Sequence, residues 1–352
     1  ARVFTAWFIN NYPDTNRPVV VIAGTGNNGG DGLAVARYLH QFFYEAKVLV
    51  YHFGEKKSID FEEQVLSMPL HDVLELNWYD HTGNFPAIDP NAVLIDALFG
   101  SGLNRPLAGH WAKVVEWINQ LPNEVVSIDI PSGLFTDEPS KDNTVVQADR
   151  TFSFETPKRA FIFPENADRV GEWAFGSIGL HPDFSATTNT DFHYLTAADI
   201  HSLYLPRKKY AHKGTFGHAL LVCGSYGKMG AAVLAARACL RAGVGLLTVH
   251  APRSGFLVIQ SEVPEAMFSA DHRAIFCTEI PDAAKYSSIG IGPGLGTAQE
   301  TMAGLEQLLQ QVKRPVVLDA DALNMLSENP AWWKHIPENS ILTPHPKEFE
   351  RL

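Results

Sequence analysis

The sequence predicts two α/β domains, in each of which helices cover both faces of a parallel sheet. Short apolar segments rich in β-branched residues alternate with longer segments of helical periodicity, which is the pattern of a parallel sheet. The 352 residues are enough for two domains of ordinary size. Residues 180–191 are polar and lack periodicity, which is typical of a linker. We therefore expect a three-layer αβα architecture in both domains.

In the first half of the chain, an apolar stripe at Val3, Phe4, Trp7 and Phe8 predicts an opening helix. Apolar, β-rich runs then alternate with helical segments, as a parallel sheet requires. The segments expected as strands are 19–23, 47–52, 92–96, 125–129 and 150–154, with helices at 33–43 and 111–121.

The second half repeats this pattern. Strands are expected at 218–223, 246–250, 287–292 and 315–319, with helices at 231–242 and 301–312. We place the first domain at residues 1–185, a linker at 186–194 and the second domain at 195–352. A short apolar stretch at 340–342 leads into a helix that starts at Pro346. Because a crossover helix exists to deliver the next strand, we expect the natural chain to continue beyond Leu352 and to begin before Ala1.

The composition argues against several classes of protein. A formal net charge of −11 disfavours a nucleic-acid binder, which would carry a basic excess. The sequence has no apolar run of the roughly 18–20 residues that a membrane span needs and no signal peptide at its start, so no membrane partner is expected. The three cysteines, Cys223, Cys239 and Cys277, lack C-x-x-C spacing, which makes disulfide and zinc interpretations poor. These features favour a reducing, cytoplasmic setting.

The clearest site signal is the segment Gly24-Thr-Gly-Asn-Asn-Gly-Gly-Asp31, between a predicted strand and a predicted helix. It contains G-x-G-x-x-G at Gly24, Gly26 and Gly29 in the strand–turn–helix context that makes the pattern meaningful. Glycines let the backbone approach a phosphate, and the helix N-terminus adds partial positive charge. An ordinary tight turn can also use glycine, but the density of Gly and Asn here favours a phosphate-binding loop.

This loop differs from the fingerprint of an ordinary NAD dehydrogenase. That fingerprint has an acidic residue at the end of the second strand, where it holds the adenosine ribose. Here the second strand ends Tyr51-His52-Phe53, and the first acid is Glu55 in the following turn. Asp31 is also an unusual neighbour for a pyrophosphate unless a cation offsets its charge.

Two further carboxylates end predicted strands. Asp96 and Asp129 should face the same crevice as Asn28 and Asp31, because ligands of open parallel sheets bind at the carboxyl ends of the strands. Either aspartate alone is as easily explained as a helix or turn cap. With Asn28 and Ser132 they offer hard oxygen ligands and a candidate acid/base, which suits an alkali or alkaline-earth cation.

Three motifs in this order resemble the NAD(P)HX epimerase (YjeF N-terminal) domain, which acts on hydrated NAD(P)H and has a Rossmann-like fold. They are Gly-x-Gly-Asn-Asn-Gly-Gly-Asp-Gly from Gly24, Asp-Ala-Leu-Phe-Gly-Ser-Gly-Leu from Asp96, and Asp-Ile-Pro-Ser-Gly from Asp129. The resemblance covers nearly all of residues 1–180. Thr25 and Ser101 are mild departures, because the family often has Pro and Thr there. The family's opening helix would precede the first residue of this sequence.

The resemblance implies a catalytic role for Asp129 at the reacting nicotinamide end of the hydrated dinucleotide. It also implies a potassium ion on Asn28, Asp96 and Ser132, and a homo-oligomer, because the family usually forms a dimer. The residues implied to contact the substrate are Asn27, Asn28, Gly29, Gly30, Asp31, Gly100, Ser101, Gly102, Leu103, Asn104, Arg105, Pro106 and Asp129.

The second half carries glycine-dense turns and strand-end acids of its own. The turn 224–230 separates a strand from an Ala-rich helix, which by itself is a structural feature. A lone loop histidine such as His345 is usually a loop residue or a helix cap. The ordered set, however, resembles the ADP/ATP-dependent NAD(P)HX dehydratase (YjeF C-terminal) domain, which has a ribokinase-like fold. The matching segments are His-Lys-Gly at 212–214, Gly-Pro-Gly-Leu-Gly at 292–296, Leu-Asp-Ala-Asp-Ala-Leu-Asn at 318–324 and Thr-Pro-His-Pro-x-Glu-Phe at 343–349.

This second resemblance implies that Ala231, Gly294 and His345 contact the hydrated cofactor. The family's nucleotide-binding segment and its Gly-x-Gly-Asp loop follow the Thr-Pro-His-Pro motif, and the sequence ends before them. We therefore expect the chain by itself to lack the catalytic part of the dehydratase.

Together the resemblances imply a bifunctional enzyme that epimerises R- and S-NADHX or NADPHX and dehydrates the S form to NAD(P)H. The nucleotide is ADP or ATP, and the fusion of both domains in one chain favours ADP. Two alternatives stay open, a vitamin-type small-molecule kinase of the ribokinase-like fold and a non-catalytic nucleotide-binding module. A phosphorylated product would favour the first.

Overall fold

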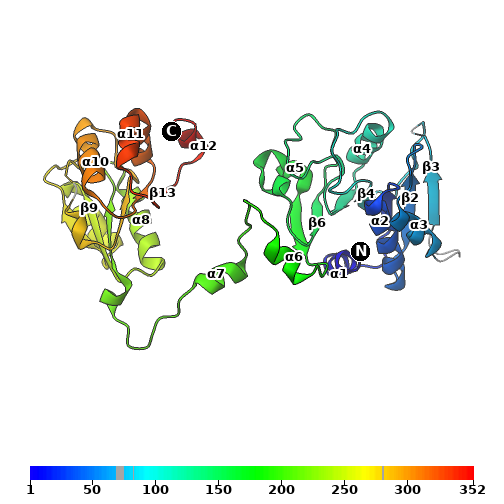
Figure 1. Cartoon of the computed structure of the whole chain (residues 1–352), viewed down its shortest axis with the longest axis horizontal. Coiled ribbons are helices and arrows are strands. Elements are labelled where there is room, and N and C mark those ends of the chain that lie inside the picture. Colours follow the sequence, from blue (N-terminus) through cyan, green and yellow to red (C-terminus); the bar gives the residue numbers. More distant parts are fainter. Residues whose placement is uncertain (69–74, 82, 280) are drawn as a thin grey trace. The chain divides into compact units, whose positions relative to one another are not determined.

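The computed structural model describes residues 1–68, 75–81, 83–279 and 281–352 and divides into two compact units, Ala1–Ala197 and Ala198–Leu352. Figure 1 shows both units as layered arrangements of strands and helices. In the described part of the chain, no helix combines the length and apolarity needed to cross a membrane.

The first unit is built on a parallel sheet with the described strand order β3-β2-β1-β4-β5-β6-β7. The strands are β1 (Val19–Ala23), β2 (Ala46–Tyr51), β3 (Glu75–Tyr79), β4 (Val93–Ala97), β5 (Glu124–Ile128), β6 (Arg150–Phe154) and β7 (Glu172–Gly176). The helices are α1 (Arg2–Asn11), α2 (Asn27–Gln41), α3 (Ile59–Leu66), α4 (His110–Gln120), α5 (Ala167–Val170) and α6 (Pro182–Thr187), with 3-10 turns η1 (Arg159–Ile162) and η2 (Pro164–Asn166).

Strand β1 shows why this sheet is covered on both faces. All five of its residues are buried, and alternate side chains enter different hydrophobic cores. Val19 and Val21 pack into the core that contains side chains of α1, α2 and α3. Val20 and Ile22 pack on the opposite face, in the core that contains the apolar side of α4. A strand buried on both faces needs a continuous apolar run, which is the pattern that the sequence shows.

The second unit has a parallel sheet of described order β10-β9-β8-β11-β12-β13. Its strands are β8 (His218–Val222), β9 (Leu246–Ala251), β10 (Met267–Ala270), β11 (Ser288–Ile291), β12 (Val317–Leu318) and β13 (Ile341–Leu342). The helices are α7 (Ala197–Leu203), α8 (Met229–Arg241), α9 (Phe256–Glu262), α10 (Gln299–Gln311), α11 (Asp321–Glu328) and α12 (Pro346–Phe349), with 3-10 turns η3 (Lys213–Phe216), η4 (Arg253–Gly255), η5 (Ala283–Lys285) and η6 (Pro330–His335).

The second sheet also separates two cores. Ala219 and Cys223 face the core with α8 and α9, whereas Leu220 and Val222 face the core with α10 and α11. This confirms the prediction of two parallel-sheet αβα units.

The differences from the predicted elements have a common physical cause. The expected central strands are present within about two residues of their predicted ends, but β3, β7 and β10 were not predicted. All three are edge strands, each paired on one side only in the described sheets. Their side chains are only partly buried, so they lack the continuous apolar run of a central strand.

Two other expectations were wrong in detail. The strand expected at 315–319 is reduced to the two residues of β12. The polar stretch at 180–191, for which no helix was predicted, contains α6. Pro182 at the first helical position and the His181 side chain, which accepts a hydrogen bond from Asp183 N, account for the start of this helix.

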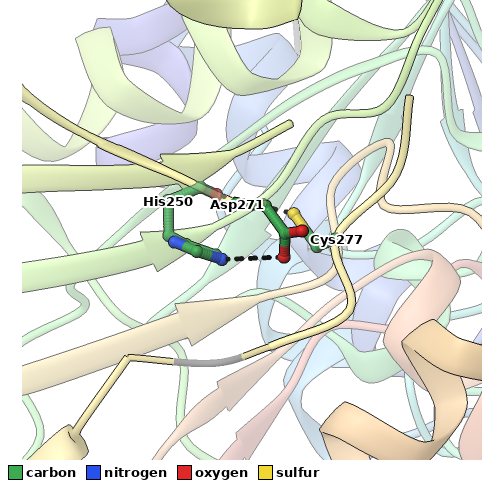
Figure 2. A group of neighbouring side chains, drawn as sticks. All are labelled: His250, Asp271 and Cys277. Carbon is green, nitrogen blue, oxygen red and sulfur yellow. Dashed lines mark hydrogen bonds and ion pairs between the residues drawn. The ribbon is translucent and has the colours of Figure 1, made fainter. Parts of the chain in front are cut away.

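At one edge of the second sheet, His250, Asp271 and Cys277 lie together in the interior (Figure 2). His250 is the penultimate residue of β9 and Asp271 follows β10, and their Nε2 and Oδ2 atoms are 3.4 Å apart. The other nitrogen of the His250 ring lies 3.1 Å from Ser269 Oγ. Burial lowers the pKa of His250, although the neighbouring carboxylate opposes this effect, so the ring is neutral at pH 7.

The Asp271 carboxylate holds the loop that follows β10. Its Oδ1 accepts hydrogen bonds from Arg273 N and Thr278 Oγ1, and its Oδ2 from Thr278 N and Glu279 N. Burial alone would raise the pKa of Asp271, but these donors outweigh it and lower the pKa. Burial raises the pKa of the Cys277 thiol. With its lone pairs taken and a protonated thiol beside it, the carboxylate serves as a structural anchor rather than as a metal ligand.

We expect this edge of the sheet to loosen on mild acidification. The pKa of His250 is lower in the folded unit than in the unfolded chain, so the folded unit favours the neutral ring. This contribution to stability is fully present above the ordinary histidine pKa of about 6.5. It is lost as the pH falls below that value, because the unfolded chain then binds the proton more readily. Hydrogen exchange of β9 and β10 amides, corrected for intrinsic rates, should therefore show lower protection at pH 5.5 than at pH 7. His250→Gln should remove this pH dependence and the exposed control His201→Gln should keep it; equal dependence in all three proteins would contradict the assignment.

Candidate functional site

A cavity of about 690 Å³ opens in the first unit where the order of the strands reverses. β1 and β4 are neighbours in the sheet, but α2 and α4, which follow them, pack on opposite faces. The loops after β1 and β4 therefore diverge and leave a crevice, which is where α/β sheets bind ligands. The cavity is lined by Thr25, Gly26, Asn27, Asn28, Asp31, Glu55, Lys56, Leu98, Phe99, Gly100, Ser101, Gly102, Leu103, Asn104, Arg105, Trp111, Asp129 and Phe154.

Most residues expected to bind substrate in the first unit line this cavity, but Gly29, Gly30 and Pro106 do not. A Cβ atom on Gly29 would lie 1.8 Å from the carbonyl oxygen of Gly24, and one on Gly30 would lie 3.2 Å from Phe61 N. Both positions thus permit close packing of the turn and of α3 on α2. Gly26, which has no side chain to cap α2, leaves the N–H groups of the first helical turn for a ligand.

Asp96 is the buried centre of the loops around this cavity. Its Oδ1 accepts hydrogen bonds from Ser132 Oγ at 2.6 Å and Leu98 N at 3.3 Å. Its Oδ2 accepts from Ser127 Oγ and Ser132 N, both at 2.8 Å. Burial raises the pKa of Asp96, and these four donors oppose that rise. The carboxylate therefore has its lone pairs occupied by the protein, and it contributes charge rather than an open coordination position.

Asn28 has an open polar group at the same place. Its amide nitrogen Nδ2 is buried and has no hydrogen-bond partner among the described residues. The side chain packs against Gly100, where an added Cβ would be 3.3 Å from Asn28 Cβ. Next to Gly100, Phe99 N donates a hydrogen bond of 2.9 Å to Ser132 Oγ. Because rotation of an amide exchanges its nitrogen and oxygen, Asn28 can present an oxygen ligand, which fits a hard alkali cation. Asp96, whose lone pairs are occupied, would contribute charge rather than a ligand atom.

Asp129 follows β5 in a strained backbone conformation. Its φ of +66° lies in the left-handed region, which non-glycine residues rarely adopt outside functional sites and turns. The carboxylate accepts hydrogen bonds from Ser101 N at 3.3 Å and from Phe154 N at 3.3 Å, and Lys158 Nζ lies 3.0 Å from its Oδ1. Asp129 thus connects the loop after β4 with the end of β6, and it forms part of the cavity wall.

In the second unit, the loops after β8 and β11 close on each other. Ser225 Oγ donates a hydrogen bond of 2.8 Å to Gly294 O, and Gly224 N donates one of 2.8 Å to Pro293 O. A Cβ on Gly294 would lie 2.9 Å from Ala231 Cβ, and its φ is +64°. Two of the three residues expected to bind the hydrated cofactor in this unit are therefore adjacent.

The third, His345, has the geometry of a helix cap. Its Nδ1 accepts a hydrogen bond from Glu348 N, and the Glu348 carboxylate accepts one from His345 N. This capping box starts α12. The ring is 57% exposed, so it remains accessible to a ligand.

Several charged residues at these two sites were not predicted from the sequence. Lys158 contacts Asp129, and Glu55 accepts a hydrogen bond of 2.7 Å from Trp111 Nε1 at the cavity wall. In the second unit, Lys228 lies 3.4 Å from Asp321, whose Oδ2 also accepts a hydrogen bond from Gly296 N. Asp321 belongs to the Leu-Asp-Ala-Asp-Ala-Leu-Asn motif at 318–324, whereas Glu55, Lys158 and Lys228 belong to none of the motifs named above. Because a buried aspartate such as Asp129 needs a nearby positive charge, the lysines and arginines close to it in the sequence could have been examined as partners, and Lys158 is one of them.

Comparison with known proteins gives matches to both units. Residues 1–160 match the family described as YjeF-related protein N-terminus, and residues 219–352 match the family described as NAD(P)H-hydrate dehydratase. The bifunctional NAD(P)H-hydrate repair enzyme Nnr of Coxiella burnetii is 32% identical, over 95% of this chain and 66% of its own length. The same enzyme of Thermosynechococcus vestitus is 33% identical, over 97% of this chain and 67% of its own length.

A similar solved structure is the ADP/ATP-dependent NAD(P)H-hydrate dehydratase of Bacillus subtilis, co-crystallised with ATP and Mg²⁺. It is 29% identical with a TM-score of 0.38, over 46% of this chain and 56% of its own. The chain spans about 66% of the length of the first curated relatives. By its match to these relatives along nearly all of its length, the chain belongs to the family of bifunctional NAD(P)H-hydrate repair enzymes.

Proposed function

We propose that the first unit epimerises hydrated NADH and NADPH, interconverting R- and S-NAD(P)HX. The observation that carries this proposal is the position of Asp129, whose backbone is strained and which lines the same cavity as the glycine loop. A cavity of about 690 Å³ is within the range of small-molecule and cofactor sites. Family membership supports the choice of substrate.

The proposed chemistry needs one group that gives and takes a proton. In hydrated NAD(P)H the ring nitrogen lone pair can expel the C6 hydroxyl, which leaves as water after it receives a proton from Asp129. The C–O bond breaks and an iminium C=N bond forms. Water then adds to C6 from either face and returns its proton to Asp129, so both epimers form and no net proton is consumed.

The glycine loop and the first turn of α2 would bind the pyrophosphate through backbone N–H groups. The residues proposed to contact the substrate are the cavity-lining Asn27, Asn28, Asp31, Gly100–Arg105 and Asp129, with Gly29, Gly30 and Pro106 supporting the loops. Asn28 and Ser132 would hold a potassium ion and Asp96 would balance its charge. When bound, the ion supplies positive charge beside the phosphates of the substrate.

For the second unit, we propose that it binds the S epimer for dehydration at the expense of ADP. Adjacent Ala231 and Gly294 and the exposed ring of His345 would contact the hydrated cofactor. The relatives are named as bifunctional repair enzymes, which supports a joint role of the two units. We also propose a homo-oligomer in a reducing, cytoplasmic setting, where the three free cysteines are compatible with the environment.

Replacement of the carboxyl group should abolish proton transfer. Asp129→Asn should lower the kcat of epimerisation by about 10²- to 10⁴-fold, the usual contribution of general acid–base catalysis. The measurement is the rate at which purified R-NADHX is converted to the S form, followed by chromatography. Asp142→Asn, at an exposed position, is the control. Unchanged epimerisation by Asp129→Asn would remove Asp129 from the mechanism.

Epimerisation should depend on potassium through Asn28. Asn28→Ala should raise the potassium concentration needed for half-maximal activity, because an amide ligand is lost. The neighbouring Asn27→Ala is the matched control, since Asn27 is exposed in the same loop and should affect the KM for substrate instead. The assay is a potassium titration at constant ionic strength. The same potassium requirement in all three proteins would refute the assigned cation site.

The second unit should lose dinucleotide binding when Gly294 is enlarged. Gly294→Val puts a side chain against Ala231 and Lys228 at a positive φ, so the turn must move. The NADPH stoichiometry, measured by fluorescence titration, should fall from two sites per chain to one. Gly230→Ala is the control, because a Cβ there meets nothing within 4 Å. Retention of both sites in Gly294→Val would contradict the proposal.

A further inference from the structure

Lys158 contacts Asp129 but does not itself line the cavity in the described part of the chain. Its Nζ is 3.0 Å from Asp129 Oδ1 and donates a hydrogen bond of 3.2 Å to Phe154 O. The lysine side chain is 17% exposed and the aspartate side chain 10%. Lys158 is not among the described residues that line the cavity, whereas Asp129 and Phe154 are.

The two oxygens of Asp129 have different surroundings. Oδ1 is held by Lys158 and accepts weaker hydrogen bonds from Ser153 Oγ at 3.4 Å and Phe154 N at 3.3 Å. From the described residues, Oδ2 accepts one hydrogen bond, from Ser101 N at 3.3 Å. Oδ1 is therefore the more firmly held oxygen, and Oδ2 has the greater capacity to accept a further hydrogen bond.

The turn after β6, which leads to Lys158, is hydrogen-bonded to the end of β7. Glu155 has a φ of +62°, so its backbone, like that of Asp129, lies in the left-handed region. Its backbone N–H donates a hydrogen bond to Gly176 O, and its carboxylate accepts hydrogen bonds from Ser177 Oγ and Ile178 N. The turn between β6 and η1 is thereby tied to the end of β7, which gives Lys158 a rigid base.

We propose that Lys158 is a positioning residue, which holds Oδ1 of Asp129 so that Oδ2 is the oxygen that exchanges the proton with the substrate. This inference rests on the proposed epimerase function and adds a residue and an atom to it. The ammonium also compensates the charge of a carboxylate that has lost most of its contact with water, which would otherwise be costly.

The test compares Lys158→Met, which keeps much of the side-chain volume but removes the charge, with Lys158→Arg, which keeps the charge. Lys141→Met, at an exposed position, is the control. In Lys158→Met, kcat for epimerisation should fall by about 10²-fold, as expected for a misplaced catalytic group, with little change in KM. Lys158→Arg should restore most of the activity. Wild-type kcat and an unshifted pH profile in Lys158→Met would overturn the proposal.

The contact between the Lys158 ammonium and the Asp129 carboxylate predicts the direction in which the pH profile of kcat should move. Lys158 is the charged side chain in contact with the Asp129 carboxylate among the described residues, while Asp31, Glu55, Lys56 and Arg105 line the cavity around it. Loss of the adjacent cation favours the protonated carboxyl. The pH profile of kcat should therefore move to higher pH in Lys158→Met and stay in place in Lys141→Met. A role confined to packing would leave this profile unchanged.

A measurement without turnover separates this proposal from the proposed function. In protein with ¹³C-labelled aspartate, the Asp129 carboxyl resonance, assigned with Asp129→Asn, should change position at pH 7 in Lys158→Met and keep its position in Lys141→Met, because the Lys158 ammonium contacts Oδ1. An unchanged resonance in Lys158→Met overturns the Lys158 inference whether or not the chain epimerises NADHX. If the resonance changes while wild-type protein shows no epimerisation, the pairing of Lys158 and Asp129 stands and the proposed reaction fails.

Discussion

The hydrogen bonds to the Asp96 carboxylate hold the first site together. A carboxylate buried to this degree is stable only with several donors, and all four donors come from the ends of β4 and β5 and the loops after them. Removal of any one would leave a buried acceptor unsatisfied, at a cost of about 1–3 kcal/mol. The hydrogen bonds between Ser132 and Asp96 also fix the turn that carries Asp129. The position of the proposed catalytic group therefore depends on Asp96, although the Asp96 carboxylate itself has no lone pair open to a ligand.

The two units use similar loops differently. In the first, the loops after β1 and β4 stay apart, and an open cavity remains between them. In the second, the loops after β8 and β11 are joined by direct hydrogen bonds, and Gly294 contacts the start of α8. Similar strand–turn–helix loops thus enclose a pocket in the first unit and pack against each other in the second. The difference arises because the loops after β8 and β11 are hydrogen-bonded to each other.

The sequence predicted the features that depend on local patterns. Central strands, the glycine loop and the strand-end aspartates all follow from periodicity and spacing, and the structure brings most of the first-unit residues to one cavity. The edge strands were missed because their side chains are only partly buried, so they lack the continuous apolar run of a central strand. Lys158 was missed because its relation to Asp129 crosses from β6 to β5, and no spacing along the chain encodes it. The contact between Gly294 and Ala231 is likewise a property of packing.

The burial of β1 and its neighbours on both faces has a consequence for folding fidelity. When both faces of a sheet are apolar, a strand that slips by one residue still buries hydrophobic side chains, so hydrophobicity alone discriminates poorly against misaligned pairing. Asp96 and Ser127 are direct partners across β4 and β5, and their side chains are joined by a hydrogen bond of 2.8 Å. A slip would place the carboxylate opposite an aliphatic residue without a donor. The hydrogen bond between Asp96 and Ser127 can therefore favour the native register of β4 and β5 over other registers that bury a similar amount of hydrophobic surface.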